Sequence, residues 1–137
     1  MSKVAMNTKL PVSPAKVWEM IGGFNALPDW HPAIESSELS DGGRTRTLAL
    51  LGGGKIVENL EHASDDEWSY SYSIVDSPLP VGNYKATIRL TEEADGTCSM
   101  AWSSDFEAVG APESQAVETI QGIYQAGFDN LKKIFGG

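Results

Sequence analysis

Cysteine, histidine and long apolar runs are scarce in this chain of 137 residues, which contains one cysteine and two histidines. The single cysteine, Cys98, rules out an intramolecular disulfide framework and favours a reducing compartment. The opening segment, MSKVAMNTKLPV, has no apolar stretch long enough for a signal peptide or a membrane span. We therefore expect a cytoplasmic protein without a membrane span.

Positive charge is also scarce. Ten Lys and Arg residues stand against 19 Asp and Glu residues, so the formal net charge is −9 and the pI is near 4.5. Nucleic acids and anionic membranes attract basic surfaces, and the sequence has no basic cluster with interleaved aromatic residues. We expect no nucleic-acid partner. The acidity can equally serve only to keep the protein soluble.

The few candidate metal ligands show no metal-site spacing. His31, His62 and Cys98 are far apart in the sequence and match no arrangement of zinc ligands. Cys98 has no basic neighbour in sequence that would lower its pKa, so we interpret it as a packing residue. We expect no metal and no other cofactor.

Two short helices are predicted after a first strand. Residues 4–12 alternate apolar and polar side chains, as a half-buried strand does. Ser13 and Pro14 are typical of a helix N-cap and first helical position, and Gly22 ends this helix. The proline-containing segment 24–32 allows only a short second helical turn.

Strand and turn patterns continue to residue 109, and a long helix follows. From Glu113 to Phe135 apolar residues recur every third or fourth position, which predicts an amphipathic helix. Gly122 and Gly127 weaken this helix by roughly 1 kcal/mol each relative to alanine; alternatively, they let it approach a neighbour or leave room for a ligand. Six strands are predicted before it, paired antiparallel with their neighbours: 34–39, 44–51, 55–62, 68–75, 83–91 and 97–107.

This order of elements predicts an α+β fold in one domain over residues 1–137. A curved antiparallel β-sheet of about seven strands wraps around a long C-terminal helix, with two short helices after the first strand. The predicted sheet must bury the apolar stripe of the long helix on its concave face.

Six segments carry a resemblance to a known family: Val17-Trp18, Pro28 to Pro32, Arg46 to Leu48, Val57 to Leu60, Pro78 to Tyr84 and Met100 to Trp102. With them the chain resembles the SRPBCC superfamily, the helix-grip fold of START-type lipid-transfer domains and birch-pollen-allergen-like proteins. Within that superfamily it is similar to the polyketide cyclase/dehydrase-like branch. The resemblance covers essentially the whole chain but implies no single reaction, because members include binders, transfer proteins and cyclases.

Strand alternation places a charge on the inner face of the predicted sheet. If Tyr70 and Tyr72 face inward, the hairpin turns also bring Arg46, Glu58 and His62 inward, with His62 at the rim because it ends its strand. A carboxylate facing a core is costly unless it is paired or wetted by a cavity. We expect Arg46 to lie opposite or diagonal to Glu58, with Tyr72 beside it. This cluster is either an ion pair that fixes the strand register or a set of polar groups that orients a ligand.

Aromatic residues are predicted to line the pocket. Each of these residues alone could be an ordinary core residue, but together they provide more rings with polar tips than a small dry core would hold. The predicted wall residues are Trp30, Tyr70, Tyr72, Tyr84, Trp102 and Tyr124. The resemblance places the second short helix at the cavity mouth, where Trp30 would form a wall and His31 would face the cavity or cap a backbone group. The loop 77–82 is either a lid or a rigid connection.

The favoured hypothesis is binding of a small hydrophobic ligand, aromatic or polyketide- or lipid-like, between the sheet and the C-terminal helix. The alternative is a cyclase, dehydratase or isomerase in which Glu58 or His31 moves a proton and Arg46 or Tyr72 stabilises an oxyanion. We expect Arg46 to lower the pKa of Glu58, which would make it a weak base and counts against an enzyme. A third hypothesis is a partner of another protein without a cavity of consequence. The sequence leaves a homodimer open.

Overall fold

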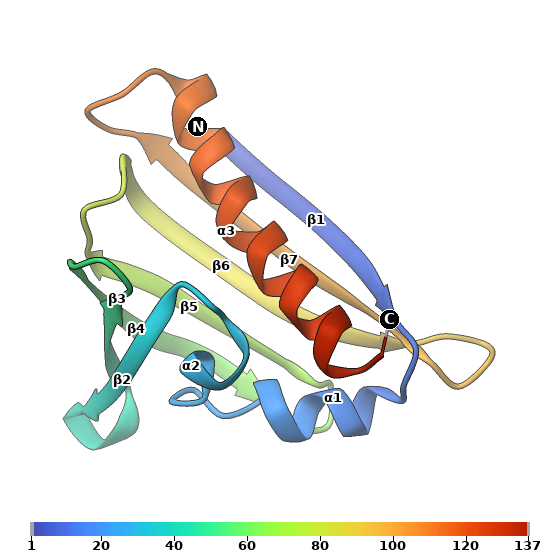
Figure 1. The fold of residues 1–137 in the computed structure, drawn as a ribbon. Coiled ribbons are helices and arrows are strands. Elements are labelled where there is room, and N and C mark those ends of the chain that lie inside the picture. The colour runs from blue at the N-terminus through green and yellow to red at the C-terminus, as the bar shows by residue number, and fades with distance from the viewer. Residues whose placement is uncertain (1, 137) are drawn as a thin grey trace.

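Helix α3 (Glu113–Ile134) lies against the concave face of a seven-stranded antiparallel sheet (Figure 1). A computed structural model describes residues 2–136; Met1 and Gly137, which the predicted domain over residues 1–137 includes, lie outside this range. Across the sheet the strand order is β1-β7-β6-β5-β4-β3-β2. The strands are β1 (Ser2–Leu10), β2 (Ile34–Ser40), β3 (Thr45–Leu50), β4 (Lys55–Ser64), β5 (Ser69–Asp76), β6 (Val81–Glu92) and β7 (Cys98–Ala108).

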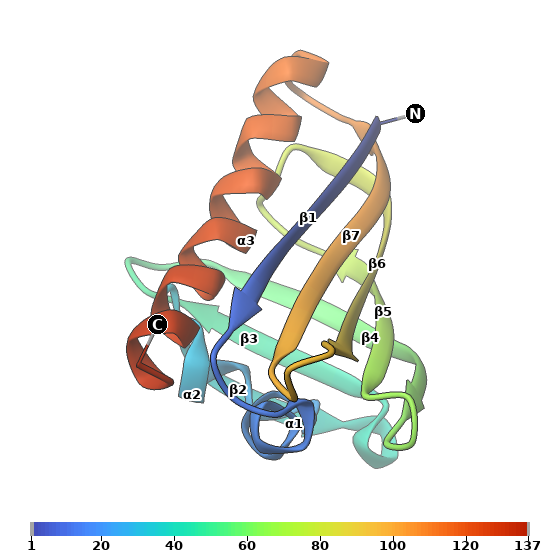
Figure 2. The same ribbon diagram turned by 90° about the vertical axis from the view of Figure 1, so that its right-hand side faces the viewer.

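The sheet curves around the helix. Strands β1 and β7 run beside α3, whereas β3 and β4 cross the lower part of the molecule (Figure 2). The short helices α1 (Pro14–Ile21) and α2 (Leu27–Trp30) lie at the same end, and a 3-10 turn η1 (Asp41–Gly43) joins β2 to β3. The predicted α+β architecture is confirmed. Among residues 2–136, no helix has the length and apolar character that crossing a bilayer requires.

Local sequence explains where these elements begin and turn. The Ser13 hydroxyl accepts a hydrogen bond from the backbone N–H of Lys16 at 3.4 Å, which caps α1 as predicted. The β3–β4 hairpin turns through Gly52, Gly53 and Gly54, which all have positive φ values of 92° to 109°. Glycine adopts this left-handed region without the steric cost that a Cβ atom imposes.

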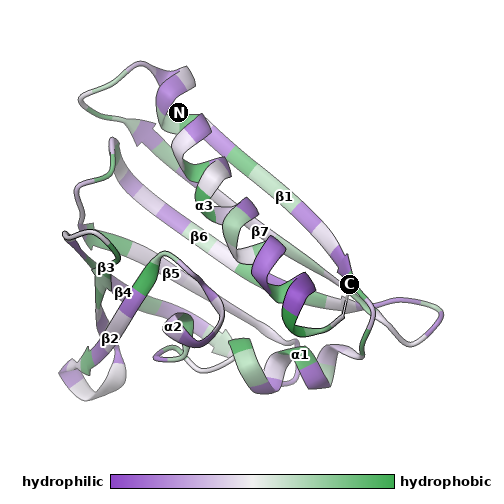
Figure 3. Cartoon of the chain, in the orientation of Figure 1, coloured by the Kyte–Doolittle hydropathy of each residue, from purple (hydrophilic) through white to green (hydrophobic). Residues whose placement is uncertain are grey.

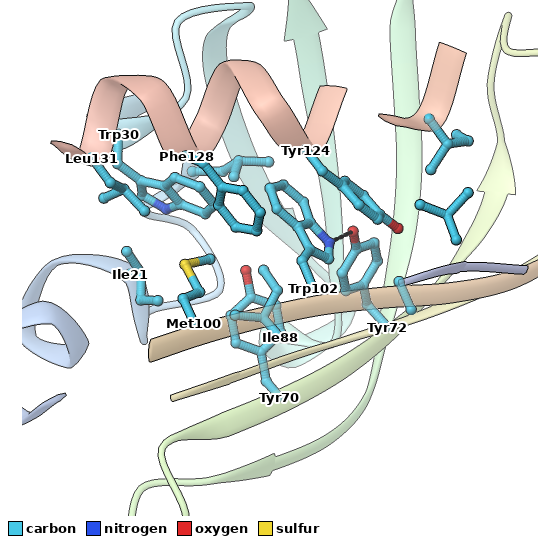
Figure 4. Packing of buried hydrophobic residues seen from close by; sticks show 14 of the residues in the cluster. Ile21, Trp30, Tyr70, Tyr72, Ile88, Met100, Trp102, Tyr124, Phe128 and Leu131 are labelled. Carbon is cyan, nitrogen blue, oxygen red and sulfur yellow. Dashed lines mark hydrogen bonds between the residues drawn. The ribbon is translucent and has the colours of Figure 1, made fainter. Parts of the chain in front are cut away.

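The buried side of α3 packs on an aromatic core. The helix presents Tyr124, Phe128 and Leu131 to the sheet (Figure 4), and the Trp102 and Tyr124 rings stack with centroids 4.2 Å apart. Polar and apolar residues alternate along β6, as a strand with one solvated face requires (Figure 3). The rings against α3 belong to a core that also contains many aliphatic residues from the sheet and the short helices.

Gly127 lets α3 approach this core closely. A Cβ atom at this position would lie 2.9 Å from the Trp30 ring and 3.1 Å from the rings of both His31 and Trp102. At Gly122 the same atom would meet nothing within 4 Å. Close approach, one of the two alternatives considered from the sequence, therefore applies to Gly127 and not to Gly122.

The strand register confirms most of the predicted inner face. Arg46 pairs directly with Glu58 across β3 and β4, and Tyr72 is diagonal to Glu58 because it pairs with Leu60. The prediction that His62 faces inward is wrong: His62 is exposed. An irregularity between Leu60 and His62 adds one residue to β4, so that His62 pairs with an outward-facing serine of β5. A bulge of this kind reverses which face the following side chains occupy.

Candidate functional site

An ion pair between Arg46 of β3 and Glu58 of β4 lies buried on the inner face of the sheet. The Nε group of Arg46 donates a hydrogen bond to Oε1 of Glu58 at 2.8 Å, and Nη2 lies 2.7 Å from the same oxygen in the ion pair; both side chains are buried. The Nη1 group of Arg46 donates to the backbone carbonyl of Phe24 at 2.7 Å. The guanidinium carbon lies 4.1 Å from the centroid of the Phe24 ring and 5.1 Å from that of Tyr72. These rings add cation–π attraction where water is excluded.

Burial changes the acidity of Glu58. Loss of hydration raises its pKa above the usual value, and attraction to Arg46 offsets this only in part. The prediction that Arg46 keeps the pKa of Glu58 low is therefore wrong, because desolvation of the whole carboxyl group outweighs one guanidinium. Glu58 is a stronger base than the sequence suggested.

A chain of hydroxyl groups runs beside the ion pair. Trp102 Nε1 donates to the Tyr72 hydroxyl at 3.1 Å (Figure 4), and Tyr72 and Tyr84 hydroxyls are 3.5 Å apart. The Tyr84 hydroxyl in turn forms a hydrogen bond with the Tyr124 hydroxyl. Burial raises the pKa of Tyr72 and of Tyr84 well above the usual value, so both hydroxyls stay neutral.

A narrow inner pocket of about 40 Å³ reaches the ion pair from the side of α3. Outside it lies a wider vestibule of about 230 Å³, bordered by the β3–β4 turn and by the loop before β6. The two hollows share the side chains His31, Ile34, Ile56, Leu79 and Ile123, so together they form one funnel. The deeper walls of the inner pocket are Leu27, Leu48, Glu58, Tyr72, Ile74, Tyr84, Trp102 and Ile120.

The structure brings only part of the predicted wall to this funnel. Tyr72, Tyr84 and Trp102 line the inner pocket, as does Glu58. Trp30, Tyr70 and Tyr124 are fully buried but belong to neither lining. They lie one layer further back: the Trp30 ring is 5.5 Å from Trp102, and the Tyr70 ring is 6.0 Å from Tyr72. Arg46 also lies outside both linings.

His31 faces the funnel with both ring nitrogens already bonded. Nε2 is 2.7 Å from the Ile123 carbonyl, and Nδ1 accepts from the Ala33 backbone N–H at 3.2 Å. This pattern assigns the proton of the neutral ring to Nε2. Burial lowers the pKa of His31, which keeps the ring neutral. Neither nitrogen is free to exchange a proton with a ligand.

Several aliphatic residues of the funnel escaped the sequence reasoning. Ile123 lines both hollows, although it is outside the apolar stripe predicted for the long helix. Its apolar side chain, directly next to Tyr124 of that stripe, could have indicated that Ile123 faces the funnel. The contact of Phe24 with Arg46 left no such signal, because it joins residues from a loop and a distant strand.

A larger hollow lies elsewhere on the molecule. It is a groove of about 500 Å³ on the outer face of the sheet, lined by charged and small polar residues such as Lys3, Glu61, Lys85 and Asp105. Its apolar lining is limited to Ala5 and to the edges of Tyr72 and Ala86, which face inward. The funnel is the better candidate because it combines apolar walls with convergent polar groups.

Comparison with known proteins places the chain in a family. Residues 1–136 match the family described as polyketide cyclase / dehydrase and lipid transport. The solved structure of the protein XoxI from Bacillus cereus is 40% identical with a TM-score of 0.96, over 98% of this chain and 96% of that one. An uncharacterised protein from Bacillus thuringiensis is 39% identical with a TM-score of 0.96, over 99% and 100% of the two chains. No curated protein matches significantly.

More distant structures share the fold. A START superfamily protein from Mycobacterium smegmatis has a TM-score of 0.80 at 12% identity, over 98% of this chain and 97% of that one. Ara h 8.0201 has a TM-score of 0.78 at 20% identity, over the same shares. The predicted helix-grip fold is confirmed. The chain belongs to the polyketide cyclase/dehydrase and lipid transport family.

Proposed function

We propose that this protein binds a small, largely apolar molecule in the funnel between the sheet and α3. The observation that carries the proposal is the shape of the funnel: a vestibule with mainly aliphatic walls narrows onto Glu58 and Tyr72. Apolar walls supply affinity by releasing water, and a few polar groups at a fixed position supply orientation. The family and the fold support hydrophobic ligand binding.

Each predicted site residue takes a role in this proposal. Tyr72, Tyr84 and Trp102 contact the ligand directly, and Arg46 holds the Glu58 carboxylate in place. Trp30, Tyr70 and Tyr124, the second layer of rings, keep those walls rigid. His31 ties α3 to the segment before β2 through its two backbone hydrogen bonds.

An enzyme is the second candidate, and the raised pKa of Glu58 favours it. A carboxyl group whose pKa is raised toward the working pH is a better acid or base than one held ionised. Glu58 would move a proton alpha to a carbonyl, and the Tyr72 hydroxyl would stabilise the oxyanion. Arg46, placed outside the lining, would act only through Glu58.

Filling the vestibule tests the binding proposal. In Ile123→Trp the indole should occupy the vestibule and abolish binding of apolar probes, measured by calorimetric titration or by native mass spectrometry of ligand retained on purification. Ile134→Trp, the same exchange at an exposed position on the same helix, is the matched control and should bind as the wild type does. Equal binding by both variants would overturn the proposal. If the wild type forms a product and the Glu58→Gln variant binds the same substrate without forming it, the protein is an enzyme that uses Glu58.

A further inference from the structure

The charge that faces the funnel is negative. Among the described residues that line the inner pocket and the vestibule, Glu58 alone carries a formal charge. Arg46 lies behind the carboxylate, with its guanidinium against the Phe24 ring. A ligand that enters the funnel therefore meets the carboxylate and not the guanidinium.

Glu58 has an acceptor oxygen to spare. The hydrogen bond from Arg46 Nε and the ion-pair contact of Arg46 Nη2 both end on Oε1. No hydrogen bond within residues 2–136 reaches Oε2. A carboxylate oxygen accepts up to two hydrogen bonds, so Oε2 is available to a donor on the ligand.

The nitrogen donors around Glu58 are occupied. The indole N–H of Trp102 donates to Tyr72, and the ring N–H of His31 is engaged by the Ile123 carbonyl. Two hydrogen bonds link the Tyr72, Tyr84 and Tyr124 hydroxyls and occupy two of their three O–H groups. The pocket therefore contains no cation and no unused N–H group that could stabilise an anionic ligand. Burying an anion without such a partner is costly.

The sizes of the two hollows divide the ligand into two parts. The inner pocket, about 40 Å³, is several times smaller than the vestibule and admits only a small group. The vestibule of about 230 Å³ has room for a larger apolar body. Only one small polar group of the ligand reaches Glu58.

We infer that the funnel takes a neutral apolar molecule that ends in one hydroxyl group, a phenol or an alcohol, and refuses molecules that end in a carboxylate. The hydroxyl donates to Oε2 of Glu58 while the apolar body fills the vestibule. This inference rests on the proposed function and names the ligand class of the same site.

Three probes of similar shape test it: naphthalene, 2-naphthol and 2-naphthoate. Each is titrated into ¹⁵N-labelled protein at neutral pH, and the dissociation constant is obtained from amide shifts of Leu79 and Ile123 at the funnel. We expect 2-naphthol to bind at least about tenfold more tightly than either of the others, a difference of about 1.4 kcal/mol. If 2-naphthoate or naphthalene binds as tightly as 2-naphthol, the inference is overturned while the proposed function stands. If none of the three shifts these amides, both are overturned.

Charge variants give a second readout. Glu58→Gln removes the negative charge and should raise affinity for 2-naphthoate until the preference for 2-naphthol is lost. Glu61→Gln, which removes the same charge from the exposed side of β4, should keep the wild-type preference. If Glu58→Gln does not fold, the neutral double variant Arg46→Gln/Glu58→Gln replaces it with the same expectation. A preference that survives loss of the Glu58 charge contradicts the inference.

Discussion

Replacing Gly127 with alanine measures how tightly α3 packs against the aromatic core. The new Cβ atom would lie 2.9 Å from Trp30 and 3.1 Å from His31 and Trp102, all three of which are buried. Contacts this short force ring or helix movement, and overpacking of a core costs about 1–3 kcal/mol. Alanine also gains about 1 kcal/mol of helix propensity over glycine. We expect a net loss of about 1 kcal/mol in the free energy of unfolding.

Gly122→Ala is the matched control on the same helix. This position is exposed and has open space around it, so only the propensity gain of about 0.5–1 kcal/mol applies. The propensity gain is common to both variants, so the difference between them isolates the packing cost. Urea unfolding with unchanged m-values would measure it. Equal stabilisation of the two variants would refute the close approach of α3.

Three further predictions concern the buried polar groups. Glu58→Leu leaves the Arg46 guanidinium unpaired and should lower the free energy of unfolding by roughly 3–5 kcal/mol, whereas Arg46→Met/Glu58→Leu should recover most of it in urea titrations. Because burial raises the pKa of Glu58, the native state holds this proton more tightly than the unfolded chain does. The stability that comes from protonated Glu58 is fully present below its pKa of 4.5 in the unfolded chain, and it is lost as the pH rises through the raised pKa of the native state. The free energy of unfolding of the wild type, relative to that of Glu58→Gln, should therefore fall as the pH rises above 4.5. A difference that does not change with pH would contradict the raised pKa. His31→Phe removes the hydrogen bonds of the ring with the Ile123 carbonyl and the Ala33 N–H and should lower the free energy of unfolding by about 1–3 kcal/mol in thermal or urea unfolding. An unchanged stability would show that these bonds contribute nothing.

The two candidate functions draw on the same residue in different ways. Binding needs only an acceptor oxygen at Glu58, which the geometry of the ion pair leaves free. Catalysis needs proton transfer as well, and the raised pKa makes Glu58 better suited to it. Product formation by the wild type and not by Glu58→Gln therefore separates the two, provided that both proteins bind.

Part of the candidate site could be predicted from strand alternation. Counting residues through a short glycine turn predicted Arg46 opposite or diagonal to Glu58, because side chains of a regular strand alternate strictly. The structure shows that the two residues pair directly. The same counting failed at His62, where one extra residue in β4 reverses the faces. The pKa of Glu58 was predicted in the wrong direction because burial depth depends on the whole core, which adjacent sequence does not report.

By itself, the sequence determined the order of the elements, the inner face of most strands and the proximity of Arg46 to Glu58. These properties depend on local periods of two and 3.6 residues and on short turns, all of which are readable along the chain. Only the tertiary structure decided that Arg46 stands behind Glu58, that Trp30, Tyr70 and Tyr124 form a second layer, and that aliphatic residues line the vestibule. The physical reason is that these outcomes depend on how side chains from distant segments fill a common volume.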